Sequence, residues 1–227
     1  MAVDPANKHV IALIDNVREV DRLKKLRAPL RATASSGSKD IEVLHKSCIV
    51  LLVACWEAYV EDLVSAALKH LMTTCKDHTA IPPYVLDRIA SSHTGAKVWE
   101  LAGEGWKNVL KDNLKGVLAK TTGALNTPKT AQVDELFHKS IGLSKLSSNW
   151  SWGGLTADQA SKSLDDLVSL RGSIAHRVVA SQKVEPADVK NARDLVYHLA
   201  VKSHNITAEF LKAQVGSVPW KRVKYGA

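Results

Sequence analysis

The residues best suited to chemistry on a phosphate ester are Arg171 and His176, in the segment Leu-Arg-Gly-Ser-Ile-Ala-His-Arg over residues 170–177. Histidine has an unperturbed pKa of about 6.5, so it can take and return a proton near neutral pH. Arginine stays charged and offers a planar fork of donors that fits phosphate oxygens. We therefore interpret His176 as a candidate general acid or base and Arg171 as a candidate phosphate ligand.

The spacing of the two residues does not by itself select them. The chain contains nine arginines and nine histidines in 227 residues, for which chance predicts fewer than one Arg-x4-His pair, yet two further pairs occur, Arg88 with His93 and Arg193 with His198. The first of these precedes a serine-rich turn, and the second lies inside a long helical pattern. Sequence context therefore favours Arg171 and His176.

A predicted helix over residues 156–180 must position this pair. Thr156 and Gln159 form a capping-box pattern at its start, and apolar residues follow at helical spacing. On an ideal helix, residues five apart differ by roughly 140° around the axis, so Arg171 and His176 do not share a face. Either Gly172 and Ser173 loosen the turn, or a second protomer supplies the missing half.

Helical periodicity without a competing strand pattern predicts an all-α fold in one domain over residues 1–227. Further core helices are expected over about 7–30, 41–75 and 185–212, and the second is apolar on every side from Cys48 to Trp56, which is typical of a helix buried by several neighbours. Pro186 is expected in the first turn of the last helix.

The middle of the chain, residues 77–154, has a weaker pattern and is interpreted as an elaboration of additional helices, including one over about 96–119. Trp150 and Trp152 lie in an aromatic loop at its end, where packing is favoured over base stacking. Residues 213–227 form a basic, aromatic tail that is expected either to be disordered or to touch a phosphate backbone.

The motif at 170–177 resembles the signature of the HEPN superfamily, an arginine separated by four to six residues from a histidine, near the penultimate helix of a bundle. Residues 51–64, Leu-Leu-Val-Ala-Cys-Trp-Glu-Ala-Tyr-Val-Glu-Asp-Leu-Val, resemble the aromatic-acidic helix of the RiboL-PSP-like branch. The resemblance implies a HEPN-like helical bundle that acts as a homodimer, with the two motifs facing one cleft.

The resemblance also implies a metal-independent endoribonuclease that cleaves RNA by attack of the 2′-hydroxyl, as a toxin or defence effector with a cognate antitoxin or defence partner. Arg171 and His176 would be its catalytic residues, with no cofactor and no metal. One departure is Gly172, because catalytic members usually carry a polar residue after the motif arginine. Ser173 could replace that group, and Arg177 could add a phosphate contact.

Three alternatives remain open from the sequence. The chain could be a non-catalytic HEPN domain that binds RNA or protein, or a purely structural helical bundle. Arg171 could pair with Asp165 or Asp166, while His176 caps a helix end.

Three acidic residues of the second predicted helix could approach Arg171 and tune its environment: Glu57, Glu61 and Asp62. Glu57 is the candidate supporting residue, although acidic residues on a half-exposed helix usually face solvent.

The composition of the chain predicts a polyanionic partner and a cytoplasmic location. The formal net charge is +8, with 31 basic and 23 acidic residues, which favours RNA without requiring it. The longest apolar run has nine residues, against about 20 for a membrane span, so no membrane contact is expected. The three cysteines lack CxxC spacing and are expected to be buried thiols, and no set of four zinc ligands occurs.

Overall fold

The computed structural model of the chain describes residues 7–28, 37–121, 127–176 and 183–225, and within these ranges the fold is entirely helical. The predicted all-α class is confirmed. The α-helices are α1 (Lys8–Lys25), α3 (Gly37–Thr74), α4 (Pro83–Ala90), α5 (Gly105–Thr121), α6 (Thr130–Ile141), α7 (Ala157–His176) and α8 (Pro186–Val215). The 3-10 helices are η2 (His78–Ala80), η3 (Gly95–Leu101) and η4 (Leu146–Asn149).

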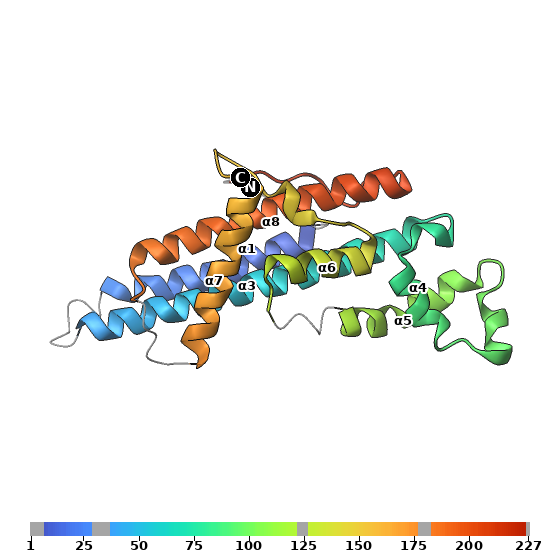
Figure 1. Ribbon diagram of the computed structural model, residues 1–227, viewed down its shortest axis with the longest axis horizontal. Coiled ribbons are helices and arrows are strands. Elements are labelled where there is room, and N and C mark those ends of the chain that lie inside the picture. Colours follow the sequence, from blue (N-terminus) through green and yellow to red (C-terminus); the bar gives the residue numbers. More distant parts are fainter. Residues whose placement is uncertain (1–6, 29–36, 122–126, 177–182, 226–227) are drawn as a thin grey trace.

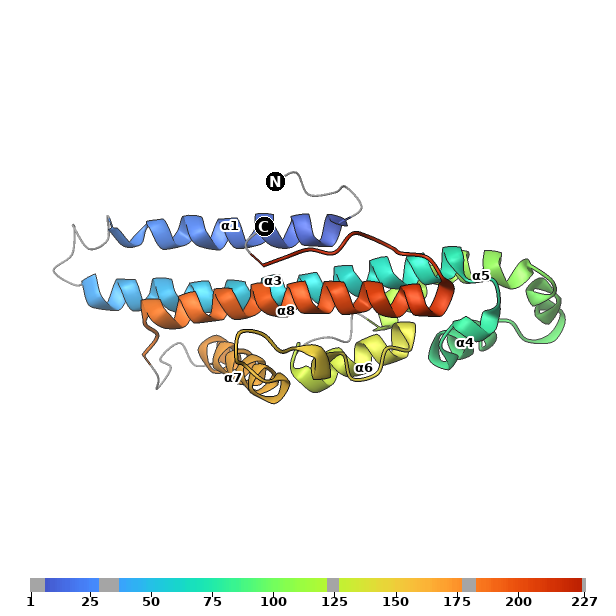
Figure 2. The same cartoon turned by 90° about the horizontal axis from the view of Figure 1, so that it is seen from above.

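Three long helices, α1, α3 and α8, run along the long axis of the molecule, and α7 crosses them steeply (Figure 1). From above, α1 lies on one side of the α3–α8 layer and α6 and α7 lie on the other (Figure 2). Helices α4 and α5 extend from the far end of α3. The motif helix α7 is thus supported by α3 along one of its faces.

Aromatic residues of α3 tie the helix to its surroundings. The Trp56 indole donates a hydrogen bond to the Pro128 carbonyl at 3.1 Å, and the Tyr59 hydroxyl donates one to the Ala200 carbonyl at 2.8 Å. Both rings are fully buried. Because each polar atom of these rings is satisfied by a backbone carbonyl, the aromatic bulk can fill the core without an unpaired donor.

One face of the central apolar run is not covered. Leu51 is 42% exposed and Ala54 is also exposed, so the expectation that residues 48–56 are buried on every side is wrong for this face. Periodicity could not reveal this, since a uniformly apolar run has no polar side to mark the solvent. The exposed face is continuous with Val43, which is 60% exposed near the start of α3.

The starts of α7 and α8 are fixed by their own side chains. The amide of Thr156 donates to Gln159 Oε1 at 2.9 Å, and the amide of Gln159 donates back to Thr156 Oγ1 at 3.2 Å, which confirms the predicted capping box. Glu185 and Asp188 form a second capping box, with Pro186 at the first turn as predicted. Both helices therefore begin where local chemistry satisfies their free amides.

The middle region contributes three α-helices: α5 and α6 pack against α3, and α4 packs against α5 and α6. The single helix predicted over about 96–119 is wrong, because the chain breaks into η3 and α5. Gly103 adopts a left-handed φ of +59°, and a Cβ at Gly105 would collide with the Glu100 carbonyl oxygen. These two glycines turn the chain sharply between the two helices.

The basic tail is ordered as far as Tyr225, so the disordered alternative is wrong. Helix α8 continues to Val215 and ends at Gly216, whose left-handed φ of +72° suits glycine, and the tail therefore begins later than residue 213. Residues 217–225, the C-terminal strap, then run back along α8 (Figure 2). Trp220 anchors the strap and is only 5% exposed.

The remaining expectations from composition concern thiols and the membrane. Cys48, Cys55 and Cys75 are free and buried as predicted, and burial raises the pKa of each thiol. Over the parts of the chain that the structure describes, no helix combines the length and the hydrophobicity that a bilayer crossing requires.

Candidate functional site

Arg171 and His176 both lie on the last turns of α7, which is helical without interruption from Ala157 to His176. The helix buries Ala160, Leu164, Leu167 and Val168, so its N-terminal half is packed and its C-terminal half carries the motif. Gly172 and Ser173 do not loosen the turn. Within one subunit the two side chains therefore leave the helix in directions about 140° apart.

Arg171 is half-buried and its Nε atom is buried without a hydrogen-bond partner. A buried unpaired donor costs roughly 1–3 kcal/mol. Among the described residues, neither a hydrogen bond nor an ion pair engages the rest of the Arg171 guanidinium. The carboxylates that could have neutralised it are engaged elsewhere. Asp165 accepts from the Thr130 amide at 2.8 Å, and Asp166 pairs with Lys162 at 2.6 Å.

Glu57 of α3 is the acidic group that acts electrostatically on Arg171. Burial raises the pKa of Glu57, and the positive charge of Arg171 opposes that effect. Burial also raises the pKa of Glu61 and of Asp62, and for Glu61 the charges of Glu57 and Asp62 add to the increase. The structure thus brings Glu57 near Arg171 without a direct ion pair between the described atoms.

His176 is exposed at the C-terminal end of α7. Among the described residues, neither a hydrogen bond nor an ion pair engages its ring. This position also fits the alternative in which a cationic histidine is stabilised by the helix dipole. Arg177 lies outside the described residues.

The two residues between the motif pair differ in what they offer. Ser173 is exposed, and its hydroxyl donates to the Leu170 carbonyl at 2.8 Å, so it remains able to accept a hydrogen bond. A Cβ added at Gly172 would meet no atom within 4 Å. The space for a polar side chain after the motif arginine is therefore present although the side chain is not.

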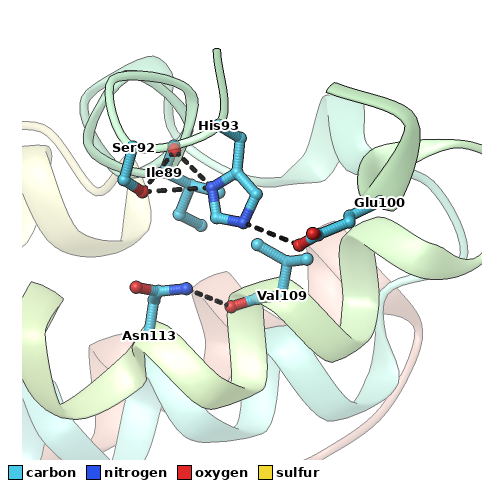
Figure 3. Close-up of polar contacts among 6 residues, drawn as sticks. All are labelled: Ile89, Ser92, His93, Glu100, Val109 and Asn113. Atoms are coloured by element: carbon cyan, nitrogen blue, oxygen red, sulfur yellow. Dashed lines mark hydrogen bonds and ion pairs between the residues drawn. The ribbon is translucent and has the colours of Figure 1, made fainter. Parts of the chain in front are cut away.

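The competing pair Arg88 and His93 is occupied by structural contacts. The Arg88 guanidinium donates to the Tyr84 hydroxyl at 2.8 Å and lies 5.1 Å from the ring centroid. His93 Nδ1 lies 2.9 Å from the Ile89 carbonyl and its Nε2 is 3.6 Å from a Glu100 carboxylate oxygen (Figure 3). A carbonyl only accepts, so Nδ1 carries the proton there and cannot activate the neighbouring Ser92 hydroxyl. His93 thus clamps the end of α4 to η3.

The competing pair Arg193 and His198 is also engaged. Arg193 pairs with Asp21 of α1 at 3.1 Å. The His198 ring is sandwiched between Trp152, with ring centroids 4.7 Å apart, and Tyr225, at 3.7 Å. Of the three Arg-x4-His pairs, the one at Arg171 and His176 has no such partners within the described part of the chain.

Sequence reasoning missed a buried histidine pair on α1 and α8. His9 Nε2 lies 2.8 Å from His204 Nδ1, and His204 Nε2 lies 2.9 Å from the Lys221 carbonyl oxygen. Because that oxygen only accepts, His204 donates from Nε2 and accepts at Nδ1 from His9. Burial lowers the pKa of His9 to about 3 and that of His204 to about 4. No sequence signal links residues 195 positions apart.

The chain is similar to a known protein family over most of its length. The family model of RiboL-PSP-HEPN matches residues 12–208, which include both the α3 segment at 51–64 and the motif of α7. The chain belongs to the RiboL-PSP-HEPN family. Membership in a HEPN family indicates, in general terms, a nuclease or other RNA-related role. Neither a curated protein nor a solved structure matches the chain.

Proposed function

We propose that this RiboL-PSP-HEPN chain is a metal-independent endoribonuclease in which Arg171 binds the scissile phosphate and His176 transfers the proton. The observation that carries the proposal is the half-buried Arg171 guanidinium, whose Nε has no partner while the nearby Asp165 and Asp166 are engaged elsewhere. An arginine held in this way can bind an anionic oxygen without first breaking an ion pair.

In the proposed reaction the RNA 2′-hydroxyl oxygen attacks the adjacent phosphorus and the bond from phosphorus to the 5′-oxygen breaks. His176 takes the 2′-hydroxyl proton and, as the imidazolium, returns a proton to the departing 5′-oxygen, so that the products are a 2′,3′-cyclic phosphate and a free 5′-hydroxyl. Arg171 stabilises the charge that develops on the nonbridging oxygens. No step requires a metal ion.

The direction in which His176 leaves α7 supports a composite site formed by two copies. Because Arg171 and His176 project about 140° apart, we propose that Arg171 of one subunit acts with His176 of its partner across a two-fold axis. The exposed face of α3, with Val43, Leu51 and Ala54, is the proposed contact between subunits, since burial of exposed apolar side chains favours association. Glu57 borders this face next to Arg171.

The family resemblance extends the proposal to biological setting. We place the enzyme in the cytoplasm among toxins or defence effectors, with a cognate antitoxin or defence partner. Ser173 and Arg177 are proposed as further RNA contacts beside the scissile phosphate. These assignments rest on the resemblance and not on contacts in the structure.

A second candidate function is favoured by Gly172. Without a polar side chain after Arg171, the chain could bind RNA or a protein partner without cleaving it. The space around Gly172 is open, so a bulky neighbour does not explain the absence of a side chain.

The test is cleavage of mixed RNA by purified protein in EDTA, beside the Arg171→Ala and His176→Ala variants. Arg88→Ala and His93→Ala serve as matched controls from a pair with the same spacing. The proposal expects cleavage by the parent and the controls, with losses of about 100-fold or more in both motif variants. Binding without cleavage in all proteins supports the second candidate instead.

A further inference from the structure

The C-terminal strap is fixed rigidly to α8 although its sequence is short and basic. Asn205 donates from Nδ2 to the Val223 carbonyl at 2.9 Å and accepts from the Val223 amide at 3.0 Å. The Trp220 indole donates to the His204 carbonyl at 3.2 Å, and His204 in turn holds the Lys221 carbonyl. The cost of ordering the strap is therefore met within the fold, before any ligand binds.

The strap ends in an aromatic stack that the function proposed above does not use. Trp152, His198 and Tyr225 are stacked in that order, with interplanar angles of 11° and 7°. The His198 ring covers one face of Tyr225, yet Tyr225 remains 46% exposed. Its hydroxyl donates to Asp194 at 3.2 Å, which fixes the orientation of the ring. The outer ring face is thus presented to solvent at the end of a preformed stack.

The C-terminal strap that carries Tyr225 is basic, whereas the charged residues that act on the Tyr225 hydroxyl are Asp194 and Arg193. Residues 217–225 contain three basic residues and no acidic residue. Lys224 is exposed, and the Arg222 side chain is 69% exposed even though it pairs with Glu209. The acidic groups nearby, Asp194 and Glu209, are occupied by Tyr225 and Arg222. Flat aromatic surface beside positive charge is the combination that binds unpaired bases and their phosphates.

We propose that Tyr225, at the end of a strap that also carries the exposed cations Arg222 and Lys224, is a stacking platform for an unpaired base of single-stranded RNA. The inference rests on the proposed function, because it assigns a second contact to the same substrate. The stack begins with Trp152, shortly before the start of α7, whereas Arg171 and His176 lie roughly 20 Å and 30 Å further along this 20-residue helix. The platform therefore binds RNA at a distance from the scissile phosphate and selects strands with unpaired bases.

The experiment measures binding of a labelled oligouridylate and of the same oligonucleotide with abasic positions, by fluorescence anisotropy in EDTA. All proteins carry His176→Ala so that the RNA stays intact. Tyr225→Ala is expected to weaken oligouridylate binding by at least about 5-fold and abasic binding by less than about 2-fold, since stacking on aromatic residues requires a base. Tyr225→Phe, which keeps the ring, is expected to bind like the parent.

The matched control is Tyr84→Ala, which removes a tyrosine of α4 that also lies beside cations, Arg88 and Lys139. It is expected to leave both affinities unchanged. Tyr225→Leu is measured in parallel, because it keeps apolar bulk against His198 without a flat outer face. Thermal unfolding curves of each variant identify any loss of folding, and Tyr225→Leu is expected to fold and to show the same loss of oligouridylate binding.

Several outcomes overturn the platform. One is an equal loss on the abasic oligonucleotide, which indicates charge alone. Another is equally tight, Tyr225-dependent binding of an acidic peptide, which indicates a protein partner. If Tyr225→Ala binds oligouridylate as tightly as the parent while RNA cleavage still depends on Arg171, the stacking platform is rejected and the proposed ribonuclease function is retained. If binding depends on Tyr225 and on the bases but the protein does not cleave RNA, the stacking platform is retained and the ribonuclease proposal is rejected.

Discussion

Glu57 on α3 and Arg171 on α7 are coupled electrostatically between two helices that pack against each other. The positive charge of Arg171 lowers the pKa of Glu57, while burial raises it by more. The site thus combines a carboxyl group whose pKa is raised with a guanidinium that is always charged. Such an arrangement leaves Arg171 partly uncompensated and available to phosphate.

Replacing Arg171 with alanine is therefore expected to raise the pKa of Glu57 further. Among the described groups, the guanidinium is the influence that opposes burial at that carboxyl group, so its removal leaves burial unbalanced. Carbon-detected NMR titration of the glutamate and aspartate carboxyl resonances measures the change. Asp62, whose pKa is raised by burial alone, is the internal control and should titrate as before. An unchanged Glu57 titration contradicts the coupling.

Acidification is expected to destabilise the fold through His9 and His204. The folded-state pKa values, about 3 and about 4, lie below the ordinary value of about 6.5, so the unfolded chain binds protons first as the pH falls. The stabilisation is complete above about pH 6.5 and is lost progressively as the pH falls, down to about pH 4 for His204 and about pH 3 for His9. Urea unfolding at a series of pH values measures this loss.

The variant that tests the histidine pair is His9→Phe, which keeps a ring beside Tyr59 and Trp220. It removes one titrating group, so the free energy of unfolding should vary less with pH, by about 1.4 kcal/mol per pH unit between pH 4 and pH 6. His78→Ala on η2, an exposed position, is the matched control and should retain the parental slope. A parental slope in His9→Phe contradicts the prediction.

Gly172→Ala is expected to stabilise the protein by about 0.5–1 kcal/mol, because glycine in a helix interior costs about that much relative to alanine. The added methyl group meets no atom within 4 Å. For a chain of this size the melting temperature should rise by roughly 1–4 °C. Gly142→Ala is the opposite control, since Gly142 has a left-handed φ of +81° and alanine there should lower the melting temperature.

Gly172→Asn tests the functional meaning of the same position. If the missing polar group limits catalysis, asparagine should increase RNA cleavage in EDTA above the parental rate while RNA binding stays similar. The double variant Gly172→Asn with His176→Ala is the control and should remain inactive. A rate unchanged by asparagine would show that the polar group is not what limits this site.

The sequence predicted most of what local chemistry decides. The capping box at Thr156 and Gln159, the first turn at Pro186 and the buried thiols depend on neighbouring residues and were recognisable in the pattern. The break at Gly103 was missed because apolar spacing on both sides suggested one helix. The contact of His9 with His204 and the stack at Tyr225 could not be predicted, since tertiary packing brings together residues that no spacing rule connects.

The candidate site shows the same division. Context within residues 170–177 selected Arg171 and His176 from three pairs of equal spacing. The structure supports that selection, because Arg193 pairs with Asp21 and the His198 ring is stacked between Trp152 and Tyr225. These contacts could not be recognised from the sequence. The exposed face of Leu51 was invisible in an apolar run, because burial depends on which neighbours cover the helix.

A composite site predicts that two inactive variants restore activity when they are mixed. Arg171→Ala homodimers lack the phosphate ligand and His176→Ala homodimers lack the proton-transfer group. After subunit exchange, half of the dimers are mixed, and each mixed dimer holds one intact pair of Arg171 and His176 across the two-fold axis. Mixing should therefore recover about a quarter of parental cleavage.

The control for this mixing experiment is a subunit that cannot associate. Leu51→Asp places a charge on the exposed apolar face of α3, and is expected to shift the protein to monomers in sedimentation and to abolish both parental cleavage and complementation. Lys69→Asp, at an exposed position further along α3 and beyond the proposed contact, should leave the assembly intact. Full activity of a Leu51→Asp monomer would place both catalytic groups within one subunit and contradict the composite site.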